Sequence, residues 1–315
     1  MIKKIEAIKQ EISKAVVGQE HMVEALLIGI LCDGHILLEG VPGLAKTTTV
    51  KAVSDTLALN FKRVQFTPDL LPTDIIGTEI YDMKSGDFKI KKGPVFTNLL
   101  LADEINRAPA KVQSALLEVM QEKQVTIGEQ SFKIEPPFLV LATQNPVEQE
   151  GVYTLPEAQL DRFMLKIVVG YNSKEEEYKM AKMVANKTSE AINSILHKED
   201  IEILKEEVSK VHIDTQLEEY IVELIFATRD VEKYGLGEIK DYLQFGASPR
   251  ATIDMFKAVK AKAYLRTKDH VSPLDISLVF KDVLRHRIVL SYEAEAEGIT
   301  ADQILQKIIE KVPVP

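Results

Sequence analysis

The sequence predicts an α/β protein whose mostly parallel sheet carries two β-hairpin insertions and is followed by an all-α region. Three observations lead to this prediction. From about residue 30 to 170, short apolar runs alternate with helical segments, two turn-containing segments interrupt the alternation, and capped helices replace it beyond residue 171. Alternating strands and helices imply crossover connections, with ligands at the carboxyl ends of the strands. We therefore expect an α/β core over residues 1–171 and a helical domain over residues 172–315.

Composition and charge narrow the class of protein. The 315 residues are 45% apolar and 28% charged, as in an ordinary globular protein. A net charge of −9 argues against nucleic acid as a partner, because non-specific binding needs clustered Lys and Arg. Cys32, the only cysteine, cannot form an intrachain disulfide, so we expect a buried core thiol in a cytoplasmic protein. The apolar runs fall short of the ~20 residues that span a bilayer, and the scattered histidines disfavour a zinc site.

Periodicity predicts the first elements of the chain. Apolar residues at positions 2, 5, 8 and 12 repeat with a helical period, which indicates a structural helix rather than a signal peptide. The run HILLE predicts a buried strand, and TTTVKAVSDTLAL predicts a helix soon after it. The segment GVPGLAKT joins the two, so it is expected to be a strand-to-helix loop.

Two hairpins are expected within the α/β region. Residues 75–96 hold a Ser-Gly-Asp turn between alternating segments, and residues 124–134 alternate on either side of Gly128. Around them, the apolar runs in VFTNLLLAD, FLVLAT and RFMLKIVVG predict further strands, and AKVQSALLEVMQE predicts a helix. The partners of both hairpins remain open.

Helix-capping signals mark the C-terminal region. A Ser or Thr followed three residues later by Glu or Gln has capping-box spacing, and a Ser before Pro places a capping hydroxyl ahead of the first helical position. These signals predict that helices fill the region. They are Ser173 with Glu176, Thr300 with Gln303, Ser248 with Pro249, and Ser272 with Pro273.

The loop GVPGLAKT has the composition of a phosphate-binding loop. Glycines let backbone N–H groups wrap phosphates, a lysine meets the β and γ oxygens, and a hydroxyl reaches Mg²⁺. Lys46 and Thr47 take the last two roles, and ATP with Mg²⁺ is the expected ligand. The strict pattern has glycine in place of Ala45, so a plain turn with a solvated lysine is the alternative. The residues expected to bind nucleotide are Gly40, Val41, Pro42, Gly43, Leu44, Ala45, Lys46, Thr47 and Thr48.

The run LLLADE ends in two carboxylates. At the end of a buried strand, one carboxylate can hold Mg²⁺ while the next polarises the attacking water, as phosphoryl transfer requires. We assign Asp103 to the metal and Glu104 to the water, which makes the protein an ATPase. The alternative is that both acidic residues only open the following helix.

Three further residues are candidates for the same reaction. Asn145 in ATQNP can orient the water or read the γ-phosphate, although Asn-Pro is also a common turn. Arg162 in QLDRFML can neutralise charge on the transferred phosphoryl group, and a salt bridge with Asp161 is the alternative. Arg250 in GASPRAT occupies the second helical position, where the helix dipole disfavours a cation. A nearby phosphate or simple solvent exposure would explain it.

Taken in order, VVGQE, GVPGLAKT, LLLADEINRAP, ATQNP, LPEAQLDRF and GASPRAT resemble the motif series of the MoxR family of AAA+ ATPases. The resemblance covers nearly the whole chain, and the family commonly has alanine at the position of Ala45. It implies an AAA+ nucleotide-binding core with a helical lid, and ATP bound between them and between subunits of a ring. Val17, Gly18 and Gln19 match the segment that borders the adenine, and Lys46 matches the Walker A lysine.

The resemblance also implies roles for the remaining motif residues. Asp103 and Glu104 match the Walker B pair, and Asn145 matches sensor 1. Arg162 looks like the arginine finger that reaches a neighbouring subunit's nucleotide. Arg250 looks like sensor 2, acting in cis or in trans. A hexameric homo-oligomer is implied by the resemblance alone.

MoxR-like proteins are regarded as chaperone-like ATPases that mature or remodel protein clients, often with a partner that contains a von Willebrand factor A domain. The main alternative is a nucleic-acid-stimulated motor, since related helix-2-insert ATPases include helicases. The first hairpin carries four lysines that could bind nucleic acid or could form a solvated face. A nucleotide-gated scaffold and a small-molecule P-loop kinase are further alternatives. The four lysines are Lys84, Lys89, Lys91 and Lys92.

Overall fold

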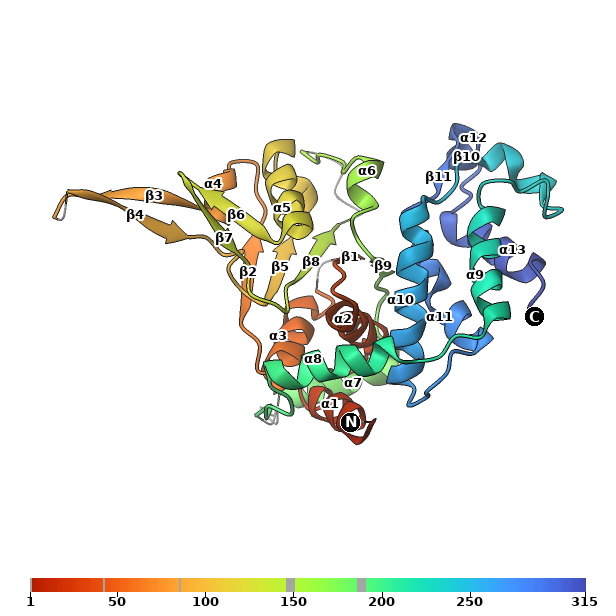
Figure 1. The fold of residues 1–315 in the computed structure, drawn as a ribbon, viewed down its shortest axis with the longest axis horizontal. Helices are drawn as coiled ribbons and strands as arrows, with labels where there is room; N and C mark the ends of the chain where they lie inside the picture. Colours follow the sequence, from red (N-terminus) through yellow and green to blue (C-terminus); the bar gives the residue numbers. More distant parts are fainter. Residues whose placement is uncertain (1, 42, 85, 146–150, 186–190) are drawn as a thin grey trace. The chain divides into compact units, whose positions relative to one another are not determined.

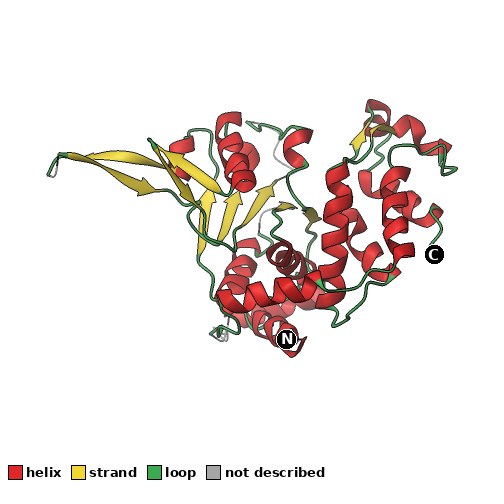
Figure 2. Ribbon diagram, viewed as in Figure 1, coloured by secondary structure: helices red, strands yellow, loops and turns green. Residues whose placement is uncertain are grey.

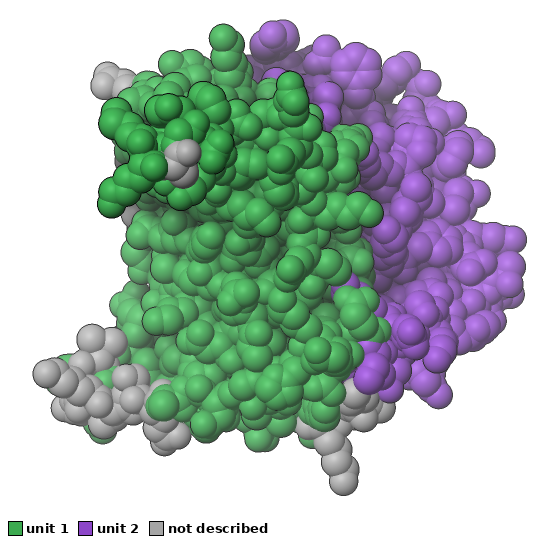
Figure 3. All heavy atoms as spheres, turned by 60° about the vertical axis from the view of Figure 1, so that its left-hand side comes forward, with its two compact units in different colours: residues 1, 3–155, 167–202 green, residues 2, 156–166, 203–315 purple. Residues whose placement is uncertain are grey.

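The computed structural model describes residues 2–41, 43–84, 86–145, 151–185 and 191–315. The chain forms two compact units, which Figure 3 shows in different colours. Residues 3–155 and 167–202 belong to the first unit, and residues 156–166 and 203–315 belong to the second. The predicted division into a nucleotide-binding core of residues 1–171 and a lid of residues 172–315 remains a prediction.

The central sheet has five strands in the order β2-β5-β8-β1-β9. The pairs β2/β5, β5/β8 and β1/β8 are parallel, so helical crossovers connect strands that are not consecutive in the chain. Leu99 to Leu101 in β5 are fully buried, as expected for a strand covered on both faces. This confirms the predicted α/β fold (Figure 1). The strands are β1 (Ile36–Glu39), β2 (Phe61–Gln65), β5 (Leu99–Asp103), β8 (Leu139–Gln144) and β9 (Leu165–Val168).

Amphipathic and buried helices accompany this sheet. Ile5, Ile8 and Ile12 are at most 2% exposed, which confirms the N-terminal helix predicted from their spacing. The prediction that Cys32 is a buried core thiol is wrong. It is the last residue of its helix, beyond the buried run that ends at Leu31, and it is partly exposed. The helices are α1 (Ile2–Ser13), α2 (Glu20–Cys32), α3 (Lys46–Thr56), α4 (Pro72–Ile76), α5 (Ala110–Glu122) and α7 (Lys174–Ala185), with the short 3₁₀ helix η1 (Ile105–Arg107).

Both predicted hairpins are present as two-stranded antiparallel sheets. β3 (Gly77–Asp82) pairs with β4 (Asp87–Lys92), and β6 (Gln124–Ile127) pairs with β7 (Gln130–Lys133). Gly128 turns the second hairpin with a φ of 60°, a conformation that glycine adopts without strain. Figure 1 shows the β3–β4 hairpin reaching away from the central sheet.

The second unit is mostly helical, as predicted, and Figure 2 shows its helices in red. It also contains a two-stranded sheet, β10 (Leu243–Phe245) with β11 (Val289–Leu290), that is too short to leave an alternating pattern in the sequence. α8 (Lys198–Ser209) holds residues of both units. The other elements are α6 (Glu157–Leu160), α9 (Thr215–Ala227), η2 (Gly237–Tyr242), α10 (Pro249–Leu265), α11 (Pro273–Leu284), α12 (Tyr292–Ala296) and α13 (Ala301–Lys311).

Most of the predicted helix caps form. Thr300 and Gln303 make a capping box at α13, and Ser272 caps α11 as expected. Ser248 is the exception, because it occupies the N-cap position of α10 but makes no capping hydrogen bond there. Its hydroxyl donates to the carboxylate of Asp161 instead. Among the helices of the described residues, none is both long and apolar enough to cross a membrane.

Candidate functional site

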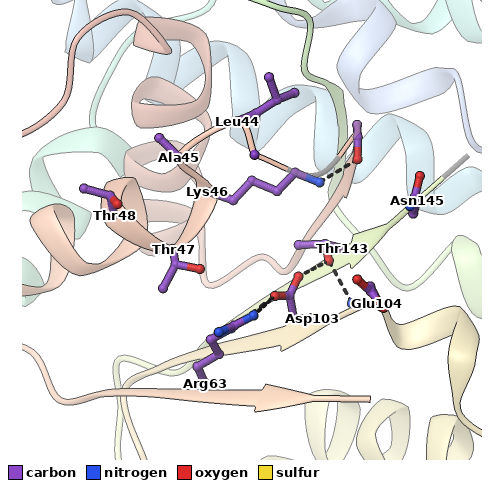
Figure 4. Close-up of a pocket in the computed structure, with 12 residues that line it drawn as sticks. Leu44, Ala45, Lys46, Thr47, Thr48, Arg63, Asp103, Glu104, Thr143 and Asn145 are labelled. Atoms are coloured by element: carbon purple, nitrogen blue, oxygen red, sulfur yellow. Dashed lines mark hydrogen bonds and ion pairs between the residues drawn. The ribbon is translucent and has the colours of Figure 1, made fainter. Parts of the chain in front are cut away.

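A cavity of about 390 Å³ lies in the first unit, where β1, β5 and β8 end (Figure 4). This is the edge of the sheet at which parallel α/β folds bind their ligands. Most of the predicted phosphate-loop residues line it, together with both predicted catalytic carboxylates. The lining residues are Gly40, Gly43, Leu44, Ala45, Lys46, Thr47, Thr48, Arg63, Asp103, Glu104, Thr143 and Asn145.

The phosphate loop leads from β1 straight into α3. Gly43 has a φ of 88°, and Ala45, the N-cap residue of α3, has a φ of 53°. A left-handed conformation costs an L-residue roughly 1–2 kcal/mol, which explains why the strict sequence pattern has glycine at the position of Ala45. Val41 also belongs to the loop, whereas Pro42 lies outside the described residues. The first N–H groups of a helix have no acceptor within the helix, so the first turn of α3, which lines the cavity, is suited to bind an anion.

Lys46 begins α3 and extends across the loop (Figure 4). Its Nζ donates a hydrogen bond of 2.6 Å to the carbonyl oxygen of Gly40. Burial lowers the pKa of the Lys46 ammonium, while the charges of Asp103 and Glu104 oppose that shift. The ammonium group of Lys46 is therefore hydrogen-bonded to the loop backbone and interacts electrostatically with both carboxylates.

Asp103 ends β5, and both of its carboxylate oxygens have donors. Oδ1 accepts a 2.6 Å hydrogen bond from the hydroxyl of Thr143 in β8. Oδ2 accepts from Arg63 in β2, through Nη2 at 2.6 Å and Nε at 3.1 Å. These contacts orient the carboxylate toward the cavity, as Figure 4 shows.

Glu104 adopts a left-handed conformation, with a φ of 55°, directly after the strand. Its backbone N–H donates to the Thr143 hydroxyl at 2.8 Å, and its Oε2 lies 3.2 Å from Arg107 Nη1. One buried hydroxyl, that of Thr143, thus contacts both acidic residues. Asn145 follows β8, is 8% exposed and lines the same cavity. Its role in reading the γ-phosphate remains a prediction.

Sequence reasoning missed Arg63 and Thr143. Thr143 lies within the ATQNP motif, but a threonine in a strand is too common to suggest a role. Arg63 lies on a strand of mixed polarity, and only the pairing of β2 with β5 brings it to Asp103. Its partner is 40 residues away in the sequence, so no local spacing could have indicated it.

The segment predicted to border the adenine forms its own cluster in the first unit. Gln19 Nε2 donates to Asn172 Oδ1 at 2.7 Å, and Asn172 Nδ2 donates to the carbonyl oxygen of Val17 at 3.2 Å. Gly18 has a φ of 72°, which suits glycine. Among the described residues that line the cavity, none comes from this segment. Its role in binding adenine remains a prediction.

The two predicted arginines, Arg162 and Arg250, belong to the second unit. The alternative expectation, a salt bridge between Asp161 and Arg162, is not what the structure contains. Asp161 instead accepts from Ser248, and its carboxylate oxygens lie 3.5 Å from Arg287 Nε and 3.8 Å from Arg250 Nη1. Arg250 Nη1 also donates to the backbone carbonyl of Asp161 at 3.3 Å.

The donors around the cavity suit Mg²⁺ bound together with a nucleotide. Thr47 and Asp103 offer hard oxygen atoms, which Mg²⁺ prefers. Among the described residues, no cluster of three or more His, Cys, Asp or Glu side chains could hold a metal by itself. In nucleotide sites Mg²⁺ usually takes one or two protein oxygens and completes its shell with phosphates and water.

Comparisons with known proteins agree with this geometry. A family model described as "ATPase family associated with various cellular activities (AAA)" matches residues 35–165, and one described as "AAA lid domain" matches residues 238–308. Chaperone MoxR1 of Mycobacterium tuberculosis is 48% identical over 305 residues, which are 97% of this chain and 81% of that protein. Protein MoxR of Methylorubrum extorquens is 32% identical over 98% of this chain and 94% of its own length.

A crystal structure of a candidate ATPase from Cytophaga hutchinsonii is also similar. It is 54% identical in sequence and matches with a TM-score of 0.95, over 100% of this chain and 96% of that one. The fold described above therefore has an experimental counterpart over its full length.

Proposed function

The chain belongs to the MoxR family of AAA+ ATPases, and on that premise we propose that it is a Mg²⁺-dependent ATPase that assembles into a ring and remodels protein clients. The observation that carries this proposal is the convergence of Lys46, Asp103 and Glu104 on one cavity at the carboxyl edge of the sheet. Two motifs far apart in the sequence supply these groups, which phosphoryl transfer from ATP requires.

Each side chain of the cavity has a proposed task. Lys46 leaves the Gly40 carbonyl to meet the β and γ phosphate oxygens, while Thr47 and Asp103 hold Mg²⁺. Mg²⁺, when bound, neutralises charge on the phosphates. Glu104 accepts a proton from the attacking water, and Asn145 orients that water against the γ-phosphate.

Residues outside the cavity complete the proposed site. Val17, Gly18 and Gln19 border the adenine, and Arg250 contacts phosphate as sensor 2. Arg162 reaches the nucleotide of a neighbouring subunit, so the active site is shared and activity depends on assembly. A hexameric ring in the cytoplasm, with a partner that contains a von Willebrand factor A domain, is the arrangement that we propose from family membership.

Exposed apolar side chains on the β3–β4 hairpin support a protein client. Tyr81 and Phe88 pack across the strands with ring centroids 5.3 Å apart, yet they are 53% and 68% exposed, and Met83 is 90% exposed. Exposed apolar clusters of this kind mark surfaces that bind proteins. Of the four lysines that suggested nucleic acid, Lys89 pairs with Asp82, and another, Lys92, packs over two phenylalanine rings.

ATP hydrolysis per subunit, measured across a range of protein concentrations, tests the proposal. Glu104→Gln and Arg162→Ala are measured beside the unmodified protein. We expect specific activity to rise with concentration, both variants to be inactive alone, and a mixture of the two to recover part of the activity. Activity that is independent of concentration and of Arg162 would contradict the shared site and leave a monomeric ATPase.

The hairpin has a separate test. Replacing Met83 and Phe88 with serine should leave basal ATP hydrolysis unchanged, because both side chains lie outside the cavity. It should abolish any stimulation of hydrolysis by a carboxymethylated, permanently unfolded protein. Stimulation by duplex or single-stranded DNA in place of the unfolded protein would instead favour a nucleic-acid motor.

A further inference from the structure

Arg162 is built into the helical unit rather than into the unit that bears the cavity. The segment of residues 156–166 packs with residues 203–315. Within this segment, α6 ends at Leu160 with Asp161 as its C-cap residue, and the side chain of Phe163 is fully buried. Arg162 therefore lies between two residues whose positions the helical unit fixes.

The carboxylate of Asp161 is held by donors from two other parts of this unit. The hydroxyl of Ser248 donates to its two oxygens at 3.0 and 3.1 Å. Arg287 Nε lies 3.5 Å from one oxygen, and Arg250 Nη1 lies 3.8 Å from the other. Ser248 is the N-cap residue of α10, and Arg250 is in the first turn of that helix. Asp161 thus ties the turn that bears Arg162 to the start of the helix that bears Arg250.

The residue on the other side of Arg162 is anchored as firmly. The carbonyl oxygen of Phe163 accepts a 2.8 Å hydrogen bond from Arg287 Nη2, and His286 Nε2 lies 2.8 Å from the same oxygen. The side chain of Arg287 is fully buried and also pairs with Asp254 in α10 at 2.5 Å. The backbone on both sides of Arg162 is therefore fixed to the same helix.

The guanidinium of Arg162 is left for a ligand. It is partly exposed, and it forms no hydrogen bond or ion pair with any of the residues that the structure describes. Asp161, the acidic group next to it in the chain, is engaged by Ser248, Arg250 and Arg287. An anchored backbone with an unpaired guanidinium is the arrangement that preorganised recognition of a phosphate needs.

We propose that Asp161 is a positioning residue, which couples Arg162 to the helix that carries Arg250 so that the two arginines move as one body. The inference rests on the proposed function, in which Arg162 serves the nucleotide of a neighbouring subunit. Loss of the Asp161 carboxylate would release the Arg162 turn and give Arg162 a less defined position. The subunit's own cavity, which contains neither residue, would remain intact.

Mixed-subunit ATPase assays test this proposal. We expect Asp161→Ala to lower the turnover number at least tenfold. Asp161→Asn, which keeps an oxygen for Ser248 but loses the charge, should lower it less, and Ser248→Ala should lower it a few-fold. Glu104→Gln subunits retain Asp161 and Arg162, so mixing them with Asp161→Ala subunits should restore activity as fully as it does for Arg162→Ala subunits.

Lys46→Ala subunits mixed with Glu104→Gln subunits are the matched control, since both have defective cavities and the mixture should stay inactive. Rescue of Arg162→Ala but not of Asp161→Ala would overturn the positioning role and leave the shared site standing. Absence of rescue for Arg162→Ala would overturn the shared site itself. If Asp161→Ala fails to fold, the Asp161→Asn and Ser248→Ala variants undergo the same mixing test, and full activity in both would overturn the inference.

Discussion

The hydroxyl of Thr143 offers the sharpest test of how the cavity is organised. Thr143 is 1% exposed, donates to Asp103 Oδ1 at 2.6 Å and accepts from the backbone N–H of Glu104 at 2.8 Å. Thr143→Val keeps the shape of the side chain and removes both hydrogen bonds. A hydrogen bond to a charged group contributes about 1.5–3 kcal/mol, and a buried N–H without a partner costs about 1–3 kcal/mol.

These two effects predict that Thr143→Val lowers the free energy of unfolding by about 2–4 kcal/mol. They also predict a roughly ten- to hundredfold lower turnover number, because a catalytic group displaced by about 1 Å can lose that much rate. Urea unfolding followed by circular dichroism measures the first quantity, and steady-state ATP hydrolysis measures the second.

Thr143→Ser is the matched control, because it keeps the hydroxyl and removes only a methyl group. It should retain most of the activity and lose about 1 kcal/mol of stability through the lost methyl group. A Thr143→Val variant with the stability and turnover of the unmodified protein would refute the reasoning. In that case Arg63 and the strand itself would be sufficient to position Asp103.

Three further predictions concern other residues of the first unit. Arg63→Gln should lower the Mg²⁺ concentration for half-maximal hydrolysis a few-fold, because the guanidinium would compete with Mg²⁺ for the Asp103 carboxylate. A higher requirement in a Mg²⁺ titration would contradict this. Burial lowers the pKa of His35 from 6.5 to about 4 in the folded protein, so the unfolded state takes up the proton first as pH falls. The free energy of unfolding, measured by urea titration, should therefore drop by about 3 kcal/mol between pH 6.5 and pH 4. The control is His35→Gln: if its free energy of unfolding falls equally steeply with pH, the prediction is contradicted. Ala45→Gly should keep its activity and change stability by no more than about 1 kcal/mol, since relief of left-handed strain offsets the greater freedom of the unfolded chain. Ala45→Val should be less stable and less active than Ala45→Gly when urea unfolding and ATP hydrolysis are measured for both variants, because a β-branched residue resists a positive φ.

The sequence was sufficient to predict the fold class because each local signal agreed with the global pattern. The loop GVPGLAKT lies between a strand and a helix, and both hairpins form where turn residues interrupt the alternation. The carboxylates of LLLADE lie at the end of β5, as expected for the carboxyl end of a buried strand. Within the candidate site, the residues found from the sequence are those whose chemistry follows from local position at an element's end.

The residues that could not be found are those whose partners come from other strands or helices. Arg63 meets Asp103 only because β2 pairs with β5, and Thr143 meets it only because β8 lies on the other side of β5. In the helical unit, Ser248 was expected to cap its own helix, but it makes no capping hydrogen bond there, and its hydroxyl donates to the carboxylate of Asp161, 87 residues away in the sequence. Each of these contacts joins segments tens of residues apart.

These distant contacts share one physical feature. In both units a carboxylate beside a functional group is held by a hydroxyl and an arginine: Asp103 by Thr143 and Arg63, and Asp161 by Ser248 and Arg287. These donors engage carboxylate oxygens that would otherwise attract the neighbouring cation, which is Lys46 in the first unit and Arg162 in the second. In the structure Lys46 donates to the Gly40 carbonyl, and Arg162 forms no hydrogen bond or ion pair with a described residue. Removing the hydroxyl in either unit, by Thr143→Val or Ser248→Ala, should therefore lower the turnover number for ATP hydrolysis.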